Sequence, residues 1–151
     1  MTREKTLRER AVRLLAGREH SRFDLGRKLA AYAASPEELE ALLDELVRSR
    51  LLSDDRYAEA RAHSLSRRYG SRRVAHDLKQ RGVADEALER VVAEVRHTDL
   101  ERAREVWHKR FGEAPRNAQE RAKQMRFLQY RGFAIDVIRS VIRGPGEDEP
   151  S

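Results

Sequence analysis

Paired carboxylates are the groups in this sequence most able to do chemistry. Asp54-Asp55 has the residue types for a divalent-cation site or for a general acid and base. The pair directly precedes an apolar segment of helical period, where a carboxylate stabilises the positive end of the helix dipole. Glu37-Glu38 and Asp85-Glu86 stand in the same position in other segments. We therefore interpret all three pairs as helix starts rather than as an active site.

Other reactive groups are dispersed or missing. The sequence has no cysteine, which excludes disulfides, thiolate metal sites and cysteine nucleophiles. Its eight glycines form no phosphate-binding fingerprint. No two histidines have the i, i+4 spacing with a glutamate that zinc hydrolases use; they are His20, His63, His76, His97 and His108. We predict no catalytic residue, no metal site and no cofactor.

Basic residues gather in two windows. The chain of 151 residues has 32 basic and 26 acidic residues, a net charge of +6. Residues 61–84 alone carry +6, with Asp77 as their only acid, and residues 116–143 carry +5. The predicted contact residues are Arg67, Arg68, Arg72, Arg73, Lys79 and Arg81 on one face, and Arg121, Lys123, Arg126 and Arg131 on another.

Three interpretations of these faces stay open. They can track the phosphates of a nucleic acid, dock on an acidic protein surface, or simply be solvated. Tyr69 and Tyr130 lie beside the arginines and could stack on bases. The correspondence of Tyr69 with Phe111 favours core packing for Tyr69.

The elements that position these residues are helical. Apolar residues recur at i, i+4, i+7 and i+8 from Leu7 to Leu15, with further stripes at Leu25, Leu29 and Tyr32 and from Leu39 to Val47. No segment alternates as a strand does, so the predicted fold class is all-α. Thr6, Ser35 and Thr98 precede glutamates at capping-box spacing, and Ser21 is a further N-cap. Left-handed C-terminal glycines are predicted at Gly17, Gly70, Gly82, Gly112 and Gly132.

Similar residues recur at a period near 50. Leu29, Leu78 and Leu128 correspond, as do Leu39, Leu88 and Ile138. The period predicts three tandem three-helix repeats, 1–52, 53–97 and 98–143, stacked as an elongated, curved helical-repeat protein. Residues 144–151 contain no apolar side chain and are predicted to be a disordered acidic tail.

Three motifs resemble the RecX family. Residues 52–58, L-S-D-D-R-Y-A, resemble the start of its second repeat. Residues 70–83, G-S-R-R-V-A-H-D-L-K-Q-R-G-V, resemble its central G-x-x-R-I-x-x-E-L-x-x-K-G-I, with Asp77 and Arg81 replacing the usual Glu and Lys. Residues 126–133, R-F-L-Q-Y-R-G-F, resemble its third-repeat motif. The likeness covers residues 7–143, and the first repeat matches only in pattern.

The resemblance implies a non-enzymatic regulator of homologous recombination, DNA repair and the SOS response. Such a protein binds the RecA–single-stranded DNA filament and mostly inhibits RecA ATPase, coprotease and strand-exchange activities. The partners would be the RecA filament and single-stranded DNA, directly or through the filament. The alternative is a DNA-binding helical module that acts without a recombinase.

The expected location is the cytoplasm, because no signal-peptide pattern is seen and the longest unbroken apolar run, residues 29–34, is far short of the ~20 residues that span a bilayer. We expect no membrane partner and a monomeric chain.

Overall fold

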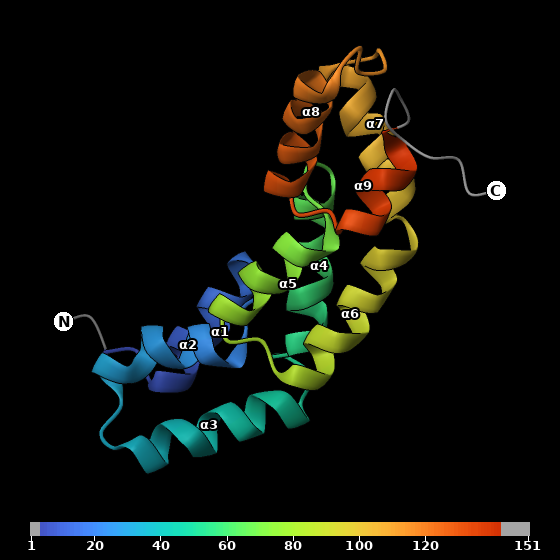
Figure 1. Ribbon diagram of the computed structural model, residues 1–151. Coiled ribbons are helices and arrows are strands. Elements are labelled where there is room, and N and C mark those ends of the chain that lie inside the picture. The colour runs from blue at the N-terminus through green and yellow to red at the C-terminus, as the bar shows by residue number, and fades with distance from the viewer. Residues whose placement is uncertain (1–3, 143–151) are drawn as a thin grey trace. The chain divides into compact units, whose positions relative to one another are not determined.

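The computed structural model describes residues 4–142, and this part is helical throughout (Figure 1). It contains nine α-helices, one 3-10 turn and no strand, which confirms the all-α prediction. The elements are α1 (Leu7–Gly17), α2 (Arg22–Leu29), η1 (Ala30–Tyr32), α3 (Pro36–Arg48), α4 (Asp54–Ser66), α5 (Ser71–Gln80), α6 (Asp85–His97), α7 (Asp99–Arg110), α8 (Ala118–Tyr130) and α9 (Ile135–Val141). The predicted acidic tail, 144–151, lies outside the described residues. Within them, no helix is both long and apolar enough to cross a membrane.

Packing divides the chain into two compact units. Unit 1 is Met1–Arg61 with Leu78–Glu89, and unit 2 is Ala62–Asp77 with Arg90–Ser151. Three helices, α4, α5 and α6, have residues in both units. The boundaries of the three predicted repeats stay a prediction.

The core of unit 1 is aliphatic and lies among α1, α2 and α3. Its buried residues are Ala11, Leu25, Leu29, Leu43, Leu46 and Leu52, with Leu7, Leu14, Leu15, Leu39 and Leu42 packed against them. The predicted stripes are confirmed except at two positions. Tyr32 is 58% exposed and Val47 is 45% exposed. Tyr32 leaves the stripe because α2 ends at Leu29 and the following 3-10 turn changes the angular spacing of its side chains.

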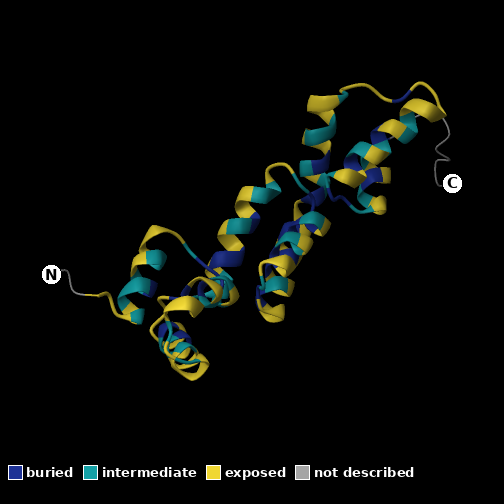
Figure 2. Cartoon of the chain, turned by 90° about the vertical axis from the view of Figure 1, so that its left-hand side faces the viewer, coloured by how far each residue is buried: buried dark blue, intermediate teal, exposed yellow. Residues whose placement is uncertain are grey.

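The core of unit 2 lies among α7, α8 and α9. Its buried residues, dark blue in Figure 2, are Ala103, Leu128, Phe133, Ile138 and Ile142. Trp107 is only partly buried against this core, and its indole N–H donates to the Gln124 side chain at 2.8 Å. A buried indole needs such a partner, so this bond fixes α7 against α8.

Of the three predicted capping boxes, Thr6 forms a complete one, Ser35 forms only one of the two bonds because the Glu38 carboxylate accepts from the Ala34 N–H instead, and Thr98 forms none. The Glu9 N–H donates to the Thr6 hydroxyl at 3.1 Å, and the Thr6 N–H donates back to the Glu9 carboxylate at 3.3 Å. The Ser35 hydroxyl accepts from the Glu38 N–H at 3.1 Å. The prediction for Thr98 is wrong. Only one residue separates α6 from α7, so Thr98 has a ψ of 3° and its hydroxyl donates to the Val95 carbonyl at the end of α6.

The predictions of left-handed glycines at helix C-termini are also correct only in part. Gly82, Gly112 and Gly132 have φ values of 71°, 70° and 95°, as left-handed C-terminal residues require. Gly17 and Gly70 are absent from the positive-φ glycines of the described residues, so those two predictions are wrong. A non-glycine residue, Arg50, takes the left-handed conformation after α3, with a φ of 64°.

A junction inside unit 1 ties the starts of α2, α4 and α6 together. One oxygen of Asp54 accepts from the Arg22 N–H at 2.7 Å, and the other accepts from the Ala84 N–H at 2.8 Å. The Ser21 hydroxyl donates to the Arg81 carbonyl at 2.9 Å. A Cβ on Gly82 would lie 2.4 Å from the Phe23 ring, so only glycine permits this approach. Asp54 is therefore a structural cap, as its position in the sequence predicted.

Unit 2 contains a junction of the same design. The Asp99 carboxylate is 3% exposed and accepts from the Ser71 N–H at 3.1 Å and from its hydroxyl at 2.5 Å. The N–H groups of Gly70 and Arg72 donate to the carbonyls of Arg131 and Gly132 in the turn after α8, at 2.8 and 3.1 Å. These are N–H groups that a helix start leaves without an intrahelical acceptor. A Cβ on Gly132 would lie 2.4 Å from the Arg73 Cβ.

A buried ion pair completes the unit 2 junction. Arg102 donates to Asp99 and also to the carbonyls of Ser66, at 2.8 Å, and Tyr69, at 2.5 Å. Burial lowers the pKa of the Arg102 guanidinium, and the neighbouring Asp99 carboxylate opposes that shift. Removing one member of such a pair leaves a buried charge uncompensated.

The capping role of Asp54 is tested by Asp54→Ala. We expect the free energy of unfolding to fall by about 1–3 kcal/mol, because two main-chain N–H groups lose their acceptor. Asp85→Ala is the matched control, since Asp85 is an exposed carboxylate at another helix start in the same unit, and we expect a loss of less than about 0.5 kcal/mol. Urea unfolding followed by circular dichroism measures both variants. Equal losses would contradict the assignment.

The close approach at Gly132 is tested by Gly132→Ala. We expect a loss of about 2–4 kcal/mol, because the new Cβ meets α5 and the left-handed φ is unfavourable for alanine. Gly17→Ala is the control: nothing lies within 4 Å of its Cβ position, and we expect no loss or a gain of up to about 1 kcal/mol. Circular dichroism during urea unfolding measures both variants, and Trp107 fluorescence reports on unit 2 alone. An unchanged midpoint for Gly132→Ala would refute this view of the junction.

Candidate functional site

Cationic and aromatic side chains gather in unit 2 where α4 ends, α5 begins and α8 ends. We call this group the arginine–tyrosine cluster; it comprises Arg68, Tyr69, Arg73, Phe127, Tyr130 and Arg131. Tyr69 lies in the short connection between α4 and α5, and its N–H donates to the Leu65 carbonyl at 3.0 Å. The junction brings the end of α8 to this connection, so residues about 60 positions apart become neighbours.

The guanidinium groups of the cluster stack on its rings. The Arg73 guanidinium lies 4.2 Å from the ring centroid of Tyr69 and 5.2 Å from that of Tyr130. The Arg131 guanidinium lies 5.7 Å from the centroid of Tyr69 and 5.1 Å from that of Phe127. Such contacts hold planar cations in fixed orientations while their N–H edges stay available to an anion.

Backbone carbonyls, rather than carboxylates, anchor these arginines. Arg73 donates to the Tyr130 carbonyl at 3.1 Å, and Arg131 donates to the Arg68 carbonyl at 3.1 Å. In the part of the chain that the structure describes, no acidic side chain forms an ion pair with Arg68, Arg73 or Arg131. Their charges are thus ordered but not neutralised, which suits them to an external anion.

A cavity of about 330 Å³ adjoins the cluster. Val106 and Phe127 give it an apolar surface, and Glu105 is its only acidic lining residue. The Arg110 guanidinium lies 5.7 Å from the Phe127 ring, which in turn packs edge-to-face on Phe111 at 5.4 Å. The cationic lining residues are Arg67, Arg68, Lys109, Arg110 and Arg131. A cavity with several cations and an aromatic wall fits an anion that also has a flat, apolar part.

The structure brings together only some of the predicted contact residues. Arg67, Arg68, Arg73 and Arg131 meet at the cluster and its cavity. Arg72 and Arg126 are exposed on α5 and α8, Arg121 is half-buried, and Lys123 borders a separate cavity of about 300 Å³ with Arg116 and Glu120. Lys79 and Arg81 are exposed residues of unit 1. The sequence placed Arg131 on a different face from Arg68, whereas both stack on Tyr69, because the Gly132 contact brings α8 to α5.

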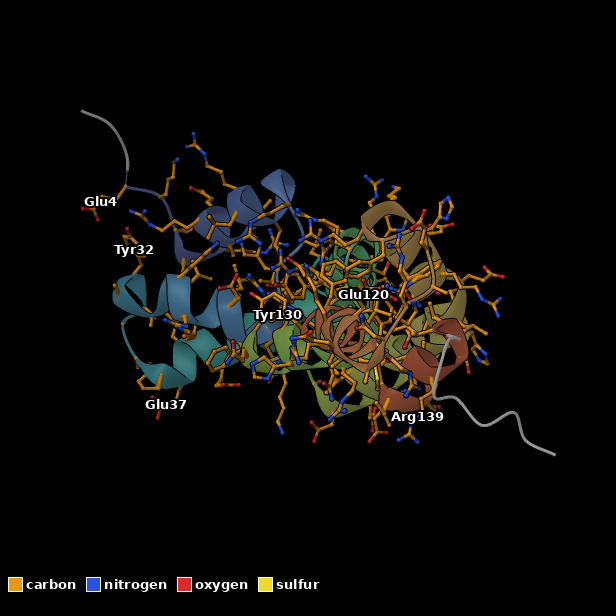
Figure 3. All side chains as sticks on the ribbon, turned by 45° about the horizontal axis from the view of Figure 1, so that its top comes forward. Glu4, Tyr32, Glu37, Glu120, Tyr130 and Arg139 are labelled. Atoms are coloured by element: carbon orange, nitrogen blue, oxygen red, sulfur yellow. The ribbon has the colours of Figure 1, made fainter. Side chains whose placement is uncertain are left out.

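The structure gives the exposure of the two tyrosines beside the predicted arginines and adds two cations that were not predicted. Tyr69 is half-buried rather than in the core, and Tyr130, labelled in Figure 3, is 73% exposed. Lys109 and Arg110 of the cavity were not predicted. Their signal in the sequence is the basic last turn of α7, a position that also stabilises the negative end of the helix dipole, so the sequence alone does not separate the two roles.

The structure also bears on metal binding. Among residues 4–142, no group of three or more His, Asp or Glu side chains is arranged to hold a metal ion.

Comparison with known proteins gives consistent matches. Family models described as the second and the third three-helix domain of RecX match residues 53–92 and 97–142. The chain is 46% identical over 145 residues to the regulatory protein RecX of Chromobacterium violaceum, covering 96% of this chain and 94% of that protein. It is 44% identical over 138 residues to its counterpart in Leptothrix cholodnii, covering 91% and 88%.

Solved structures agree with the fold. The crystal structure of RecX from Lactobacillus salivarius superimposes with a TM-score of 0.77 at 17% identity, covering 89% of this chain and 91% of that one. A second crystal structure of a regulatory protein RecX gives a TM-score of 0.74 at 20% identity, covering 89% and 70%. With matches along almost its whole length, this chain belongs to the RecX family of regulatory proteins.

Proposed function

We propose that this protein binds the RecA–single-stranded DNA filament and modulates, mostly by inhibition, the ATPase, coprotease and strand-exchange activities of RecA. It acts without catalysis, as a cytoplasmic monomer of three tandem three-helix repeats. Membership of the RecX family, whose curated relatives are named regulatory proteins, supports the regulatory role. The observation that carries the contact assignment is the arginine–tyrosine cluster, in which two guanidiniums, those of Arg73 and Arg131, are held by stacking and by backbone carbonyls and have no ion pair within the described residues.

The cluster supports contact with the nucleic-acid part of a filament. Phosphate oxygens accept two parallel hydrogen bonds from one guanidinium, and exposed Tyr130 can stack on an unpaired base. The same guanidiniums also suit acidic side chains of a protein partner. Arg67, Arg68, Arg72, Arg73, Arg126 and Arg131 are the proposed contact residues in this region, with Arg121, Lys123, Lys79 and Arg81 as further contacts.

The alternative is direct DNA binding that needs no recombinase. The exposed ring of Tyr130 beside ordered arginines favours it, because this pairing is typical of single-strand binding. Binding of an oligonucleotide without recombinase would follow a log–log salt slope of about −0.7 for each phosphate contacted. If binding without recombinase accounts for the whole biological effect, the filament is not the target.

The filament proposal is tested by the double variant Arg73→Gln/Arg131→Gln. We expect the protein concentration that half-inhibits RecA-dependent ATP hydrolysis on single-stranded DNA to rise about tenfold or more, because two charge-assisted contacts are lost. Glutamine keeps the Cβ of Arg73 that lies beside Gly132, so we expect the fold to be retained, and circular dichroism checks this.

The matched control is the double variant Arg96→Gln/Arg104→Gln, which removes the same charge from exposed positions of unit 2 outside the cluster. We expect this pair to change the half-inhibiting concentration by less than about twofold. Equal effects of the two double variants would show that only net charge matters. No inhibition by the unmodified protein would refute the filament proposal itself.

A further inference from the structure

A second cationic cavity lies in unit 1, and none of its lining residues was predicted to contact a partner. It has a volume of about 750 Å³ and is lined by residues of α1, α2 and η1 and of the connections beside them. Leu14 and Leu29 give it an apolar surface. Five lining residues are cationic and none is acidic; the cations are Lys5, Arg10, Arg13, Arg18 and Lys28.

Tyr32 gives this cavity an open aromatic surface. The Arg10 guanidinium lies 4.0 Å from the centroid of the Tyr32 ring, the shortest such distance in the described residues. The side chain is 58% exposed and projects from the ribbon (Figure 3), although the sequence pattern had assigned it to a buried stripe. An aromatic ring held by one guanidinium but left open to solvent is a stacking surface rather than a core residue.

His20 contacts a lysine that lines the cavity. The imidazole is 1% exposed, with Nδ1 3.0 Å from the Arg18 carbonyl and Nε2 3.0 Å from the Lys28 ammonium. An ammonium group can only donate, so Nε2 accepts and Nδ1 carries the hydrogen. Burial, with the charges of Lys28 and Arg18, lowers the pKa of His20, and this keeps the imidazole neutral near pH 7.

The cavity has an excess of positive charge even when the neighbouring Asp24 carboxylate is included. The Asp24 carboxylate lies 3.5 Å from Arg18 and 3.7 Å from Lys28, beyond ordinary hydrogen-bonding distance. Arg10 and Arg13 have no ion pair within residues 4–142. One carboxylate therefore lies near two of the five cations, and an anionic ligand would supply the missing negative charge.

We propose that the unit 1 cavity is a nucleotide-binding site, in which Lys28, Arg10 and Arg13 bind phosphate groups and a base stacks on Tyr32. The volume lies within the range of small-molecule sites. An apolar surface and an open aromatic ring beside the cations favour a nucleotide over an acidic peptide, which would need cations alone. The nucleotide is either free in solution or one residue of a single strand. This inference does not rest on the recombinase proposal.

The test uses the full chain without recombinase and reads the cavity locally by NMR. The ring signals of His20 and Tyr32 are followed during titration with ATP free of divalent ions, with a short oligothymidylate and with a polyglutamate peptide. We expect saturable shifts of the two rings with at least one nucleotide ligand. Shifts with ATP identify a free nucleotide as the source, and shifts with the oligonucleotide alone identify a strand.

Matched variants separate a built site from general charge attraction. Lys28→Gln is expected to raise the dissociation constant, fitted from Tyr32 signals, about five- to tenfold, and Arg10→Gln is expected to do the same in fits from His20. Arg27→Gln removes the same charge from the neighbouring position of α2, where the guanidinium lies over Phe23 outside the cavity, and is expected to change it less than about twofold.

Three outcomes would overturn the proposal: no shift of either ring with ATP or the oligonucleotide at millimolar concentration, stronger shifts with polyglutamate than with both nucleotide ligands, or an equal effect of Arg27→Gln and Lys28→Gln. The RecA ATPase assay is independent of these titrations, so failure here leaves the filament proposal intact.

Discussion

The architecture depends on one requirement, that the unpaired N–H groups at a helix start find acceptors. At two helix starts of this chain, those of α2 and α5, a carboxylate at the start of a later helix supplies an acceptor. Asp54, the first residue of α4, caps α2 from 32 positions away along the chain, and Asp99, the first residue of α7, caps α5 from 28 positions away. Beside each cap a glycine permits a close approach, of the Phe23 side chain to Gly82 in unit 1 and of the Arg73 backbone and Cβ to Gly132 in unit 2. The same solution thus appears once in each unit.

The two junctions have the same arrangement of a capping carboxylate and a glycine, but the side chain that meets the glycine differs. The residue that meets the glycine is Phe23 in unit 1 and Arg73 in unit 2. In unit 2 that arginine reaches the end of α8 and stacks on Tyr69, so the close contact that stabilises the junction also assembles the cationic cluster. The position of the cluster therefore follows from helix capping, and its chemistry follows from one side-chain difference.

Local chemistry was predictable from the sequence, and pairing between distant segments was not. The capping box at Thr6 and the left-handed Gly132 depend on neighbouring residues, so both were predicted correctly. Thr98 failed because α7 follows α6 almost without a connection, which leaves no extended residue to act as a cap. Arg131 was assigned to the wrong neighbours because its position depends on a backbone contact between residues about 60 apart. The spacing of apolar residues along the sequence does not indicate which distant segments come into contact.

Net charge alone could not have located either cationic site, because an arginine's role depends on what lies within its reach. Burial opposes the charge of Arg22, yet the hydrogen bonds that Arg22 donates to Asp44 and Glu40 outweigh burial and raise the pKa of Arg22, so this arginine is bound within the fold. Arg73 and Arg10 instead rest on tyrosine rings, which orient a guanidinium without neutralising it. A carboxylate in place of either ring would stabilise the fold by an ion pair and would neutralise the charge of the guanidinium. Stacking on an aromatic ring is thus the arrangement that keeps a cation both ordered and available.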